Sequence, residues 1–346
     1  MAGKKVYNGL DVVKFILALL IAQRHIVQIY FGTDSKWRIL IGNWLSNLGV
    51  PVFFTIAGFF LFCKLRGKPH LDNVQVRRYC GRILRLYVTW SVLYLPIDWY
   101  IWYHGERDVA AGLLDWLHKF VFCSSIVQLW YLPALALACW LVWKAYQLSL
   151  HPLLILAAGA VFLAIGVIGD NWYFNQRLPE WAFNLLWYYL QVFVTLRNGI
   201  FYGLFYVALG LCLALYRPRV PLGLSLIGFL VSFAGMFAEV WHFTDPTSYT
   251  NFVIGAAPSA LFLFLFASAL PLKNRPVYRR LRGMSEWIYL SHFYFFYFLG
   301  WLRPWIPVPF TSKTVTLMIM IPLLIFAWAM TRLSETEKGR WLRMLV

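Results

Sequence analysis

The sequence has little charge of either sign and is poorest in acidic residues. Only 13% of its 346 residues are charged, and 14 Asp and Glu stand against 31 Lys and Arg. A soluble globular domain carries about 25% charged residues. Hydrophobic residues make up 61% of the chain and recur in long runs. This composition excludes an ordinary soluble domain and predicts a polytopic helical membrane protein.

Cysteine motifs, linkers and repeats are also missing. The five cysteines form neither a CxxC pair nor a Cys/His zinc spacing, so we expect no metal site and interpret the cysteines as small packing residues. No Pro-rich or Gly/Ser-rich linker divides the chain, which predicts a single integral membrane domain over residues 1–346. The first apolar run is too long for a cleavable signal peptide and should remain as an anchor. An internal repeat, common in transporters, is not evident.

The apolar runs predict an all-α bundle of about ten transmembrane helices. The expected spans are 10–30, 40–63, 83–103, 128–148, 152–169, 199–216, 222–241, 254–271, 286–302 and 314–331. Two further segments, 110–122 and 181–196, suit helices that lie at the membrane surface, and the second also suits a re-entrant helix. The 18 Trp and 20 Tyr suit aromatic belts at the two interfaces.

The net charge of +17 is better explained by topology than by nucleic acid. If the N-terminus is cytoplasmic, most lysines and arginines outside the spans fall in cytoplasmic segments, as the positive-inside rule requires. An even number of spans then places both termini in the cytoplasm.

The first span, 10–30, carries polar groups that a passive anchor does not need. Lys14 and His25 are eleven positions apart, close to three turns, so they share one face and lie roughly 16 Å apart along the axis. Ionisable groups at this depth usually face a bundle interior or a wet cavity. His25 is a candidate general base. A lone membrane histidine is explained equally well by a hydrogen bond to a neighbouring helix, but Lys14 on the same face favours a functional role for both residues.

Basic residues open the third span. Arg78, Arg82 and Arg85 share one helical face, and arginine forks suit the phosphate groups of a cytosolic ligand. A topology signal with anionic-lipid contacts is the simpler explanation, and it is the one we favour for Arg78.

Four other residues are candidate substrate contacts. Trp130 and Tyr131 open the fourth span, where an interfacial aromatic pair is the simpler interpretation. Glu239 lies at the outer end of the seventh span and suits a polar acceptor, or an interfacial cluster. His292 is a second intramembrane imidazole.

These stretches, taken together and in order, resemble the acyltransferase-3 family of membrane O-acyltransferases over nearly the whole chain. The family carries an arginine and a histidine in its first span, where this sequence has Lys14, ten residues and His25. The other matching stretches are 50–59, 78–87, 129–132, 197–203 and 285–292. Lys14 departs from the family's arginine, keeping the charge but losing its bidentate geometry. Ala57 stands where a serine commonly precedes the glycine.

The resemblance implies transfer of an acyl group, often acetyl, from cytosolic acyl-CoA to a hydroxyl of an extracytoplasmic glycan or lipid-linked sugar in a bacterial plasma membrane. It implies His25 as general base or acyl carrier, Lys14 near the donor, and Arg82 and Arg85 on the donor phosphates. Two alternatives remain open: a transporter or flippase, and a catalytically silent membrane partner. A measurement of CoA-dependent acyl transfer would distinguish the acyltransferase hypothesis from both alternatives.

Overall fold

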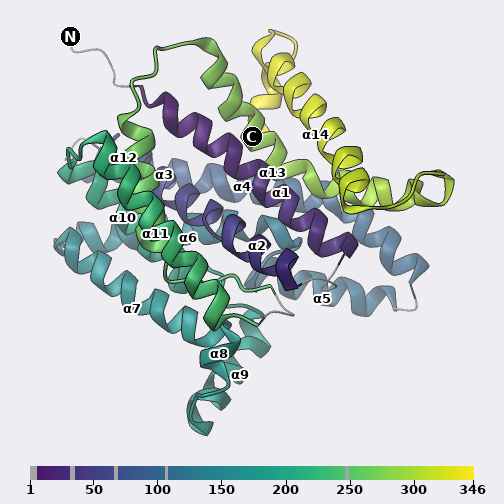
Figure 1. The fold of residues 1–346 in the computed structure, drawn as a ribbon, viewed down its shortest axis with the longest axis horizontal. Coiled ribbons are helices and arrows are strands. Elements are labelled where there is room, and N and C mark those ends of the chain that lie inside the picture. The colour runs from purple at the N-terminus through teal and green to yellow at the C-terminus, as the bar shows by residue number, and fades with distance from the viewer. Residues whose placement is uncertain (1–5, 32–35, 66–68, 106–107, 246–248) are drawn as a thin grey trace.

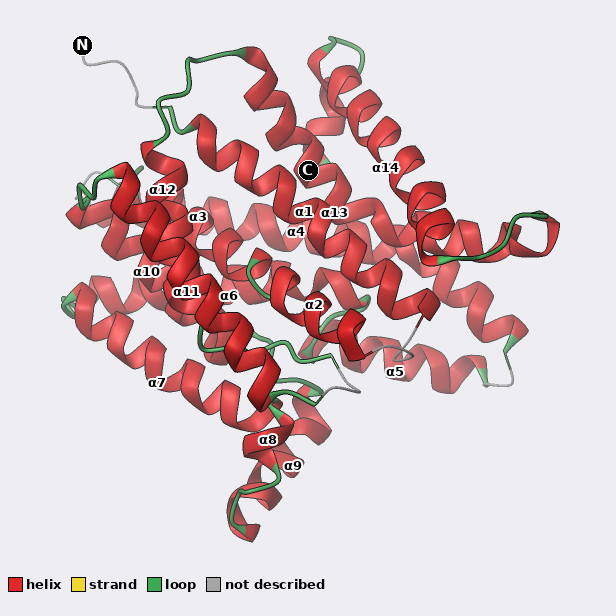
Figure 2. Ribbon diagram, in the orientation of Figure 1, coloured by secondary structure: helices red, strands yellow, loops and turns green. Residues whose placement is uncertain are grey.

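The computed structural model describes residues 6–31, 36–65, 69–105, 108–245 and 249–346, and every regular element in these ranges is a helix (Figures 1 and 2). The long helices are α1 Asn8–Phe31, α2 Lys36–Ser46, α3 Gly49–Phe62, α4 Pro69–His104, α5 Val109–Phe122, α6 Tyr131–Gln147, α7 Pro152–Asp170, α9 Glu180–Phe193, α10 Leu204–Tyr216, α11 Leu222–Phe243, α12 Ala256–Ala269, α13 Pro276–Leu302 and α14 Ser312–Glu335. The short helices are η1 Val127–Trp130, α8 Trp172–Asn175, η2 Gly199–Gly203, η3 Arg303–Trp305 and η4 Arg340–Met344. The predicted all-α membrane architecture is confirmed.

Seven helical stretches within the described ranges are long and apolar enough to cross a membrane. They are Asn8–Phe31, Ile39–Phe62, Val109–Gln147, Pro152–Asp170, Gly199–Tyr216, Leu222–Phe243 and Ser312–Glu335, and Ala256–Ala269 is a shorter apolar helix. The predicted spans 83–103 and 286–302 form the second halves of α4 and α13. The count of about ten spans therefore stays a prediction.

The segment predicted as one span over 40–63 is divided. A turn at residues 47 and 48 separates α2 from α3. The Asn47 side chain donates to the Thr250 carbonyl, 2.8 Å away, and accepts from Arg24 at 2.7 Å, so the turn is tied to other parts of the bundle. Pro51 falls in the first turn of α3, where a missing backbone N–H costs little.

The first helix crosses the centre of the bundle. Figure 1 shows α1 between α12 on one side and α13 and α14 on the other, and it also packs on α2 and α3. Beside it, α3 and α10 approach through glycines. A methyl group added to Gly210 would lie 2.6 Å from both Phe59 N and Thr55 O. Small residues permit such close contact between apolar helices.

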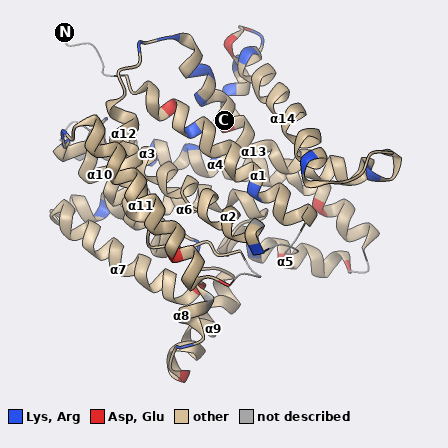
Figure 3. Cartoon of the chain, in the orientation of Figure 1, with Lys and Arg blue, Asp and Glu red and all other residues tan. Residues whose placement is uncertain are grey.

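Side-chain contacts set the relative direction of the helices. Asn8, at the start of α1, donates to the Leu272 and Lys273 carbonyls just before α13, so both helices begin at the same end of the bundle. Arg280 near the start of α13 pairs with Glu335 at the end of α14 at 3.4 Å. The two ends of the described chain thus lie at one end of the bundle, and Figure 3 shows Lys and Arg gathered there around the start of α13. That this end is cytoplasmic stays a prediction.

Candidate active site

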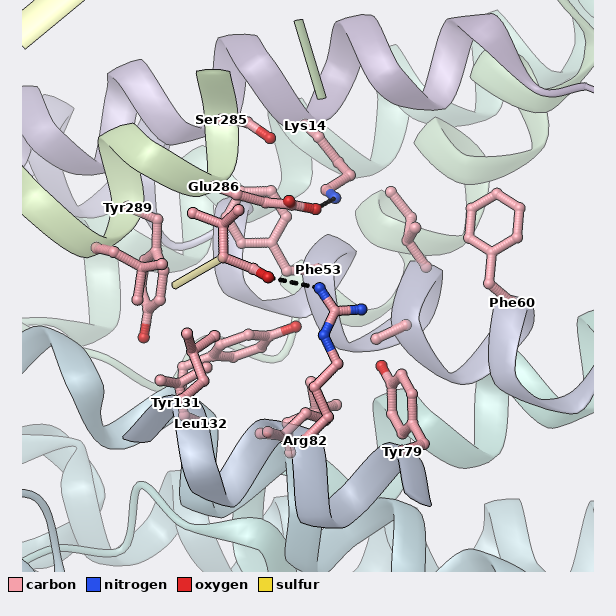
Figure 4. Close-up of a pocket in the computed structure, with 17 residues that line it drawn as sticks. Lys14, Phe53, Phe60, Tyr79, Arg82, Tyr131, Leu132, Ser285, Glu286 and Tyr289 are labelled. Carbon is pink, nitrogen blue, oxygen red and sulfur yellow. Dashed lines mark hydrogen bonds and ion pairs between the residues drawn. The ribbon is translucent and has the colours of Figure 1, made fainter. Parts of the chain in front are cut away.

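A pocket of about 240 Å³ opens beside the first half of α1. Its walls come from five helices and the last residue of the chain. Lys14 of α1 faces α3, α4, the start of α6 and Glu286 of α13 across it (Figure 4). We call it the Lys14 pocket; its lining is Lys14, Phe53, Ile56, Ala57, Phe60, Tyr79, Arg82, Ile83, Leu86, Tyr131, Leu132, Leu135, Ser285, Glu286, Tyr289, Leu290 and Val346.

Two cationic groups reach into this pocket from opposite walls. Lys14 Nζ lies 3.5 Å from Glu286 Oε1, and the two side chains are 20% and 36% exposed. From α4, Arg82 Nη2 donates to a main-chain oxygen of Val346, the last residue of the sequence, at 2.5 Å. Figure 4 shows Arg82 rising between Tyr79 and Tyr131 toward Lys14 and Glu286. A lysine and an arginine in an otherwise largely apolar pocket suit a ligand with both a polar and an extended part.

Of the three predicted phosphate-binding arginines, the structure brings only Arg82 to the pocket. Arg78 and Arg85 are exposed on α4 and are not part of its lining. The face of α4 that lines the pocket carries Tyr79, Arg82, Ile83 and Leu86. It is rotated about the helix axis by roughly one residue, about 100°, from the face that carries the three arginines. Arg82 lies where the two faces overlap.

The two predicted imidazoles meet farther along α1. The rings of His25 and His292 stack with centroids 5.4 Å apart and an interplanar angle of 23°, and Phe293 packs edge-on against His25. His292 is fully buried, and its Nδ1 lies 2.9 Å from the Ile288 carbonyl. A carbonyl only accepts, so Nδ1 carries the proton and Nε2 has a free lone pair. This Nε2 has no hydrogen-bond partner among the described residues.

The aromatic pair at the start of α6 divides between two environments. Tyr131 lines the Lys14 pocket and packs edge-on against Tyr289, with centroids 5.7 Å apart. Trp130 is buried against Tyr202 at 5.4 Å, and the Arg197 guanidinium lies over its ring at 5.6 Å. Tyr131 therefore faces the pocket, whereas Trp130 faces the polar cluster described below.

Glu239 caps the start of α12. Its two carboxylate oxygens accept from the backbone N–H groups of Ile254 at 2.7 Å and Gly255 at 2.6 Å. These donors precede α12 and would otherwise have no helical partner, and a negative charge at a helix start is favourable. The predicted role of Glu239 in acceptor binding is not tested by this arrangement, but both of its oxygens already have partners.

A polar cluster beside His25 escaped the sequence reasoning. Arg24 donates to Ser46, Asn47, the Thr250 carbonyl and Asn251, at 2.7–3.2 Å. Arg197 reaches the same Asn251 side chain at 3.5 Å. Asp170 at the end of α7 accepts from the Asn251 backbone at 3.2 Å. The signal that was available is an arginine adjacent to His25 inside an apolar span, where a charge needs several partners.

Comparison with known proteins identifies the family of the chain. The profile of the acyltransferase-3 family, an acyltransferase domain, matches residues 7–332, which include both imidazoles, the polar cluster around Arg24 and every lining residue of the Lys14 pocket except Val346. The chain belongs to this family. It is a membrane protein with an acyltransferase domain, and the resemblance inferred from its motifs is confirmed.

The curated relatives of this acyltransferase-3 protein carry other names. A serine/alanine racemase of Enterococcus gallinarum is 26% identical over 83% of this chain and 40% of its own length. An amino-acid racemase of Enterococcus faecalis is 22% identical over 95% of this chain and 46% of its own length. The chain thus spans less than half the length of these relatives. No solved structure matches it significantly.

Within the described residues, no three His, Cys, Asp or Glu side chains lie close enough together to share a metal ion. Apart from this, the cations of the Lys14 pocket and the two stacked imidazoles are the candidate residues for a reaction on a ligand.

Proposed function

We propose that this membrane acyltransferase moves an acyl group, acetyl in the first instance, from cytosolic acyl-CoA to a hydroxyl of an extracytoplasmic glycan or lipid-linked sugar. The observation that carries the proposal is the shared face of α1. It presents Lys14 to a pocket at the inner end of the bundle and His25 to His292 farther along. A bacterial plasma membrane is the proposed location.

The donor occupies the inner half of the path. CoA is too polar to cross the bilayer, but its pantetheine arm is slender and only moderately polar, which suits the lining of the Lys14 pocket. Lys14 and Arg82 hold polar atoms of the arm or its phosphate. The axial rise from Lys14 to His25 is roughly 16 Å, so the thioester at the tip of an extended arm is carried toward the imidazoles.

The chemistry then requires one base. A nitrogen of His25 takes the proton of the acceptor hydroxyl as the oxygen attacks the thioester carbonyl carbon. The carbon–sulfur bond breaks as the new ester forms, and the imidazolium returns its proton to the CoA thiolate. His292 packs against His25 and holds its ring. A covalent acyl-His25 intermediate is the competing route to the same products.

The decisive experiment measures CoA release by the purified protein in liposomes supplied with acetyl-CoA and cell-envelope glycan. We expect acceptor-dependent release that falls 10²–10⁴-fold in His25→Ala, the usual contribution of a general base. Unchanged CoA release by a folded His25→Ala variant would refute the role of His25 as general base. No release with any donor or acceptor would overturn the proposed function.

A second candidate, solute transport, is favoured by the names of the relatives. Racemases named for serine, alanine or amino acids contain a region similar to this chain, so a small amino acid is a candidate solute. Intramembrane ionisable groups also mark transport paths. Uptake of labelled serine or alanine into the same liposomes, without acyl-CoA, distinguishes this function from acyl transfer.

A further inference from the structure

A second cavity, larger than the Lys14 pocket, opens at the same end of the bundle. It measures about 600 Å³, within the range of ligand sites. It lies between the last turn of α3, the segment after α10, and α12. We call it the basic cavity; it is lined by Tyr7, Phe59, Phe60, Cys63, Lys64, Leu213, Arg217, Pro218, Arg219, Val220, Phe264, Leu265, Ser268 and Ala269.

The charges of the basic cavity all have one sign. Lys64, Arg217 and Arg219 line it, and no carboxylate does within the described part of the chain. The described residues provide no ion pair for any of the three cations, and the one hydrogen bond that these cations donate to the described residues runs from Arg217 Nε to the Ala214 carbonyl at 3.3 Å. Three uncompensated cations around one cavity favour a ligand with more than one negative charge.

The inner wall of the basic cavity is aromatic. Tyr7 packs edge-on against Phe59, with centroids 5.3 Å apart, and Phe59 against Phe264 at 4.9 Å. Phe60 extends this aromatic wall. Aromatic faces beside cations fit a ligand that joins a flat ring to phosphates, since the ring stacks while the cations bind the charge.

The two cavities are neighbours along α3. Phe53, Ile56 and Ala57 line the Lys14 pocket, Cys63 and Lys64 line the basic cavity, and Phe60 lines both. On the facing side, Tyr7 just before α1 lines the basic cavity and Lys14 the Lys14 pocket, with an axial rise of about 10 Å between them. A ligand with a flat, charged head and a slender arm can therefore occupy both.

We infer that the basic cavity binds the nucleotide end of the acyl-CoA donor, its adenine against the aromatic wall and its phosphates on Lys64, Arg217 and Arg219, while the pantetheine arm passes Phe60 into the Lys14 pocket. The inference rests on the proposed function and deepens it, because it separates the residues that hold the nucleotide from those that hold the arm.

The test uses a Lys64→Gln/Arg219→Gln double variant of the full chain, reconstituted in zwitterionic lipid. Arg217 is spared because it ends α10 with a left-handed backbone, φ 45°. Donors are acetyl-CoA and S-acetyl-pantetheine, which has the arm without the nucleotide. We expect KM for acetyl-CoA to rise about tenfold or more, as for the loss of charge-assisted hydrogen bonds, with KM for S-acetyl-pantetheine unchanged. Lys144→Gln, an exposed cation on α6 outside both cavities, should change neither.

Two kinetic outcomes overturn the inference while leaving the proposed function intact: unchanged KM for both donors, or equal increases for both. Calorimetric titration with CoA and dephospho-CoA tests the binding site separately from acyl transfer. If wild-type protein transfers from neither donor but binds CoA, and the double variant loses that binding, the site is supported and the proposed function fails. A difference between variant and wild type that appears only in bilayers containing anionic lipid assigns the cations to lipid phosphates and overturns the inference.

Discussion

Replacing Glu239 with alanine tests whether this carboxylate holds the fold or binds an acceptor. Both of its oxygens accept backbone hydrogen bonds, from Ile254 at 2.7 Å and Gly255 at 2.6 Å. Hydrogen bonds to a charged group contribute about 1.5–3 kcal/mol each. Water can replace the bond at the exposed Ile254 N–H, so we expect a loss of about 2–4 kcal/mol in the free energy of unfolding. Glu239→Gln keeps one oxygen acceptor and should lose about half as much.

Thermal unfolding followed by tryptophan fluorescence in detergent measures this loss as a lower Tm. Glu337→Ala, which removes an exposed carboxylate beyond the end of α14, is the matched control and should not shift it. The reasoning predicts that residual acyl transfer by folded Glu239→Ala keeps its KM for the acceptor. An unchanged Tm together with a raised acceptor KM would refute the capping role and assign Glu239 to acceptor binding.

Three further substitutions test other contacts. Gly210→Ala places a methyl group against the backbone of α3 and should destabilise the protein by about 1–3 kcal/mol, seen as a lower Tm, whereas Gly223→Ala, with open space around it, should not. Lys14→Met should raise KM for acyl-CoA about tenfold or more, while Lys14→Arg, which keeps the charge beside Glu286, should not. Equal effects of the two substitutions would show that the positive charge does not bind the donor. His292→Asn keeps a donor for the Ile288 carbonyl but removes the ring that stacks on His25, so kcat should fall with KM for acyl-CoA unchanged, and an intact kcat would refute the proposed role of His292 in holding His25.

Local pattern was enough to predict the fold class and part of the site. Long apolar runs predict membrane helices because the bilayer leaves the backbone no other way to satisfy its hydrogen bonds. The spacing of Lys14 and His25 predicts their common face, because a helix rotates by a constant angle per residue. The order of the motifs led to the family, whose profile covers residues 7–332.

Sequence pattern predicted less well where a helix is interrupted and which way a helix face is turned. The apolar run 40–63 has the length of one span, yet α2 and α3 separate at residues 47 and 48, just before Gly49 and Pro51, where Asn47 bonds to distant segments. Three arginines share a face of α4, but the rotation of α4 as it packs against α6 brings only Arg82 to the pocket. Periodicity shows which residues share a face, whereas neighbouring helices decide what that face meets.

The sequence by itself determined that the chain is a helical membrane protein with ionisable groups on one face of its first span, since hydrophobicity and helical period are local properties. Only the tertiary structure decided the partners of those groups. Lys14 meets Glu286 and His25 meets His292 because α1 and α13, far apart in sequence, run side by side in the same direction. The same packing joined Glu239 to the start of α12 and surrounded Arg24 with four hydrogen-bond acceptors. Such contacts depend on the register and rotation of whole helices, which no single helix encodes.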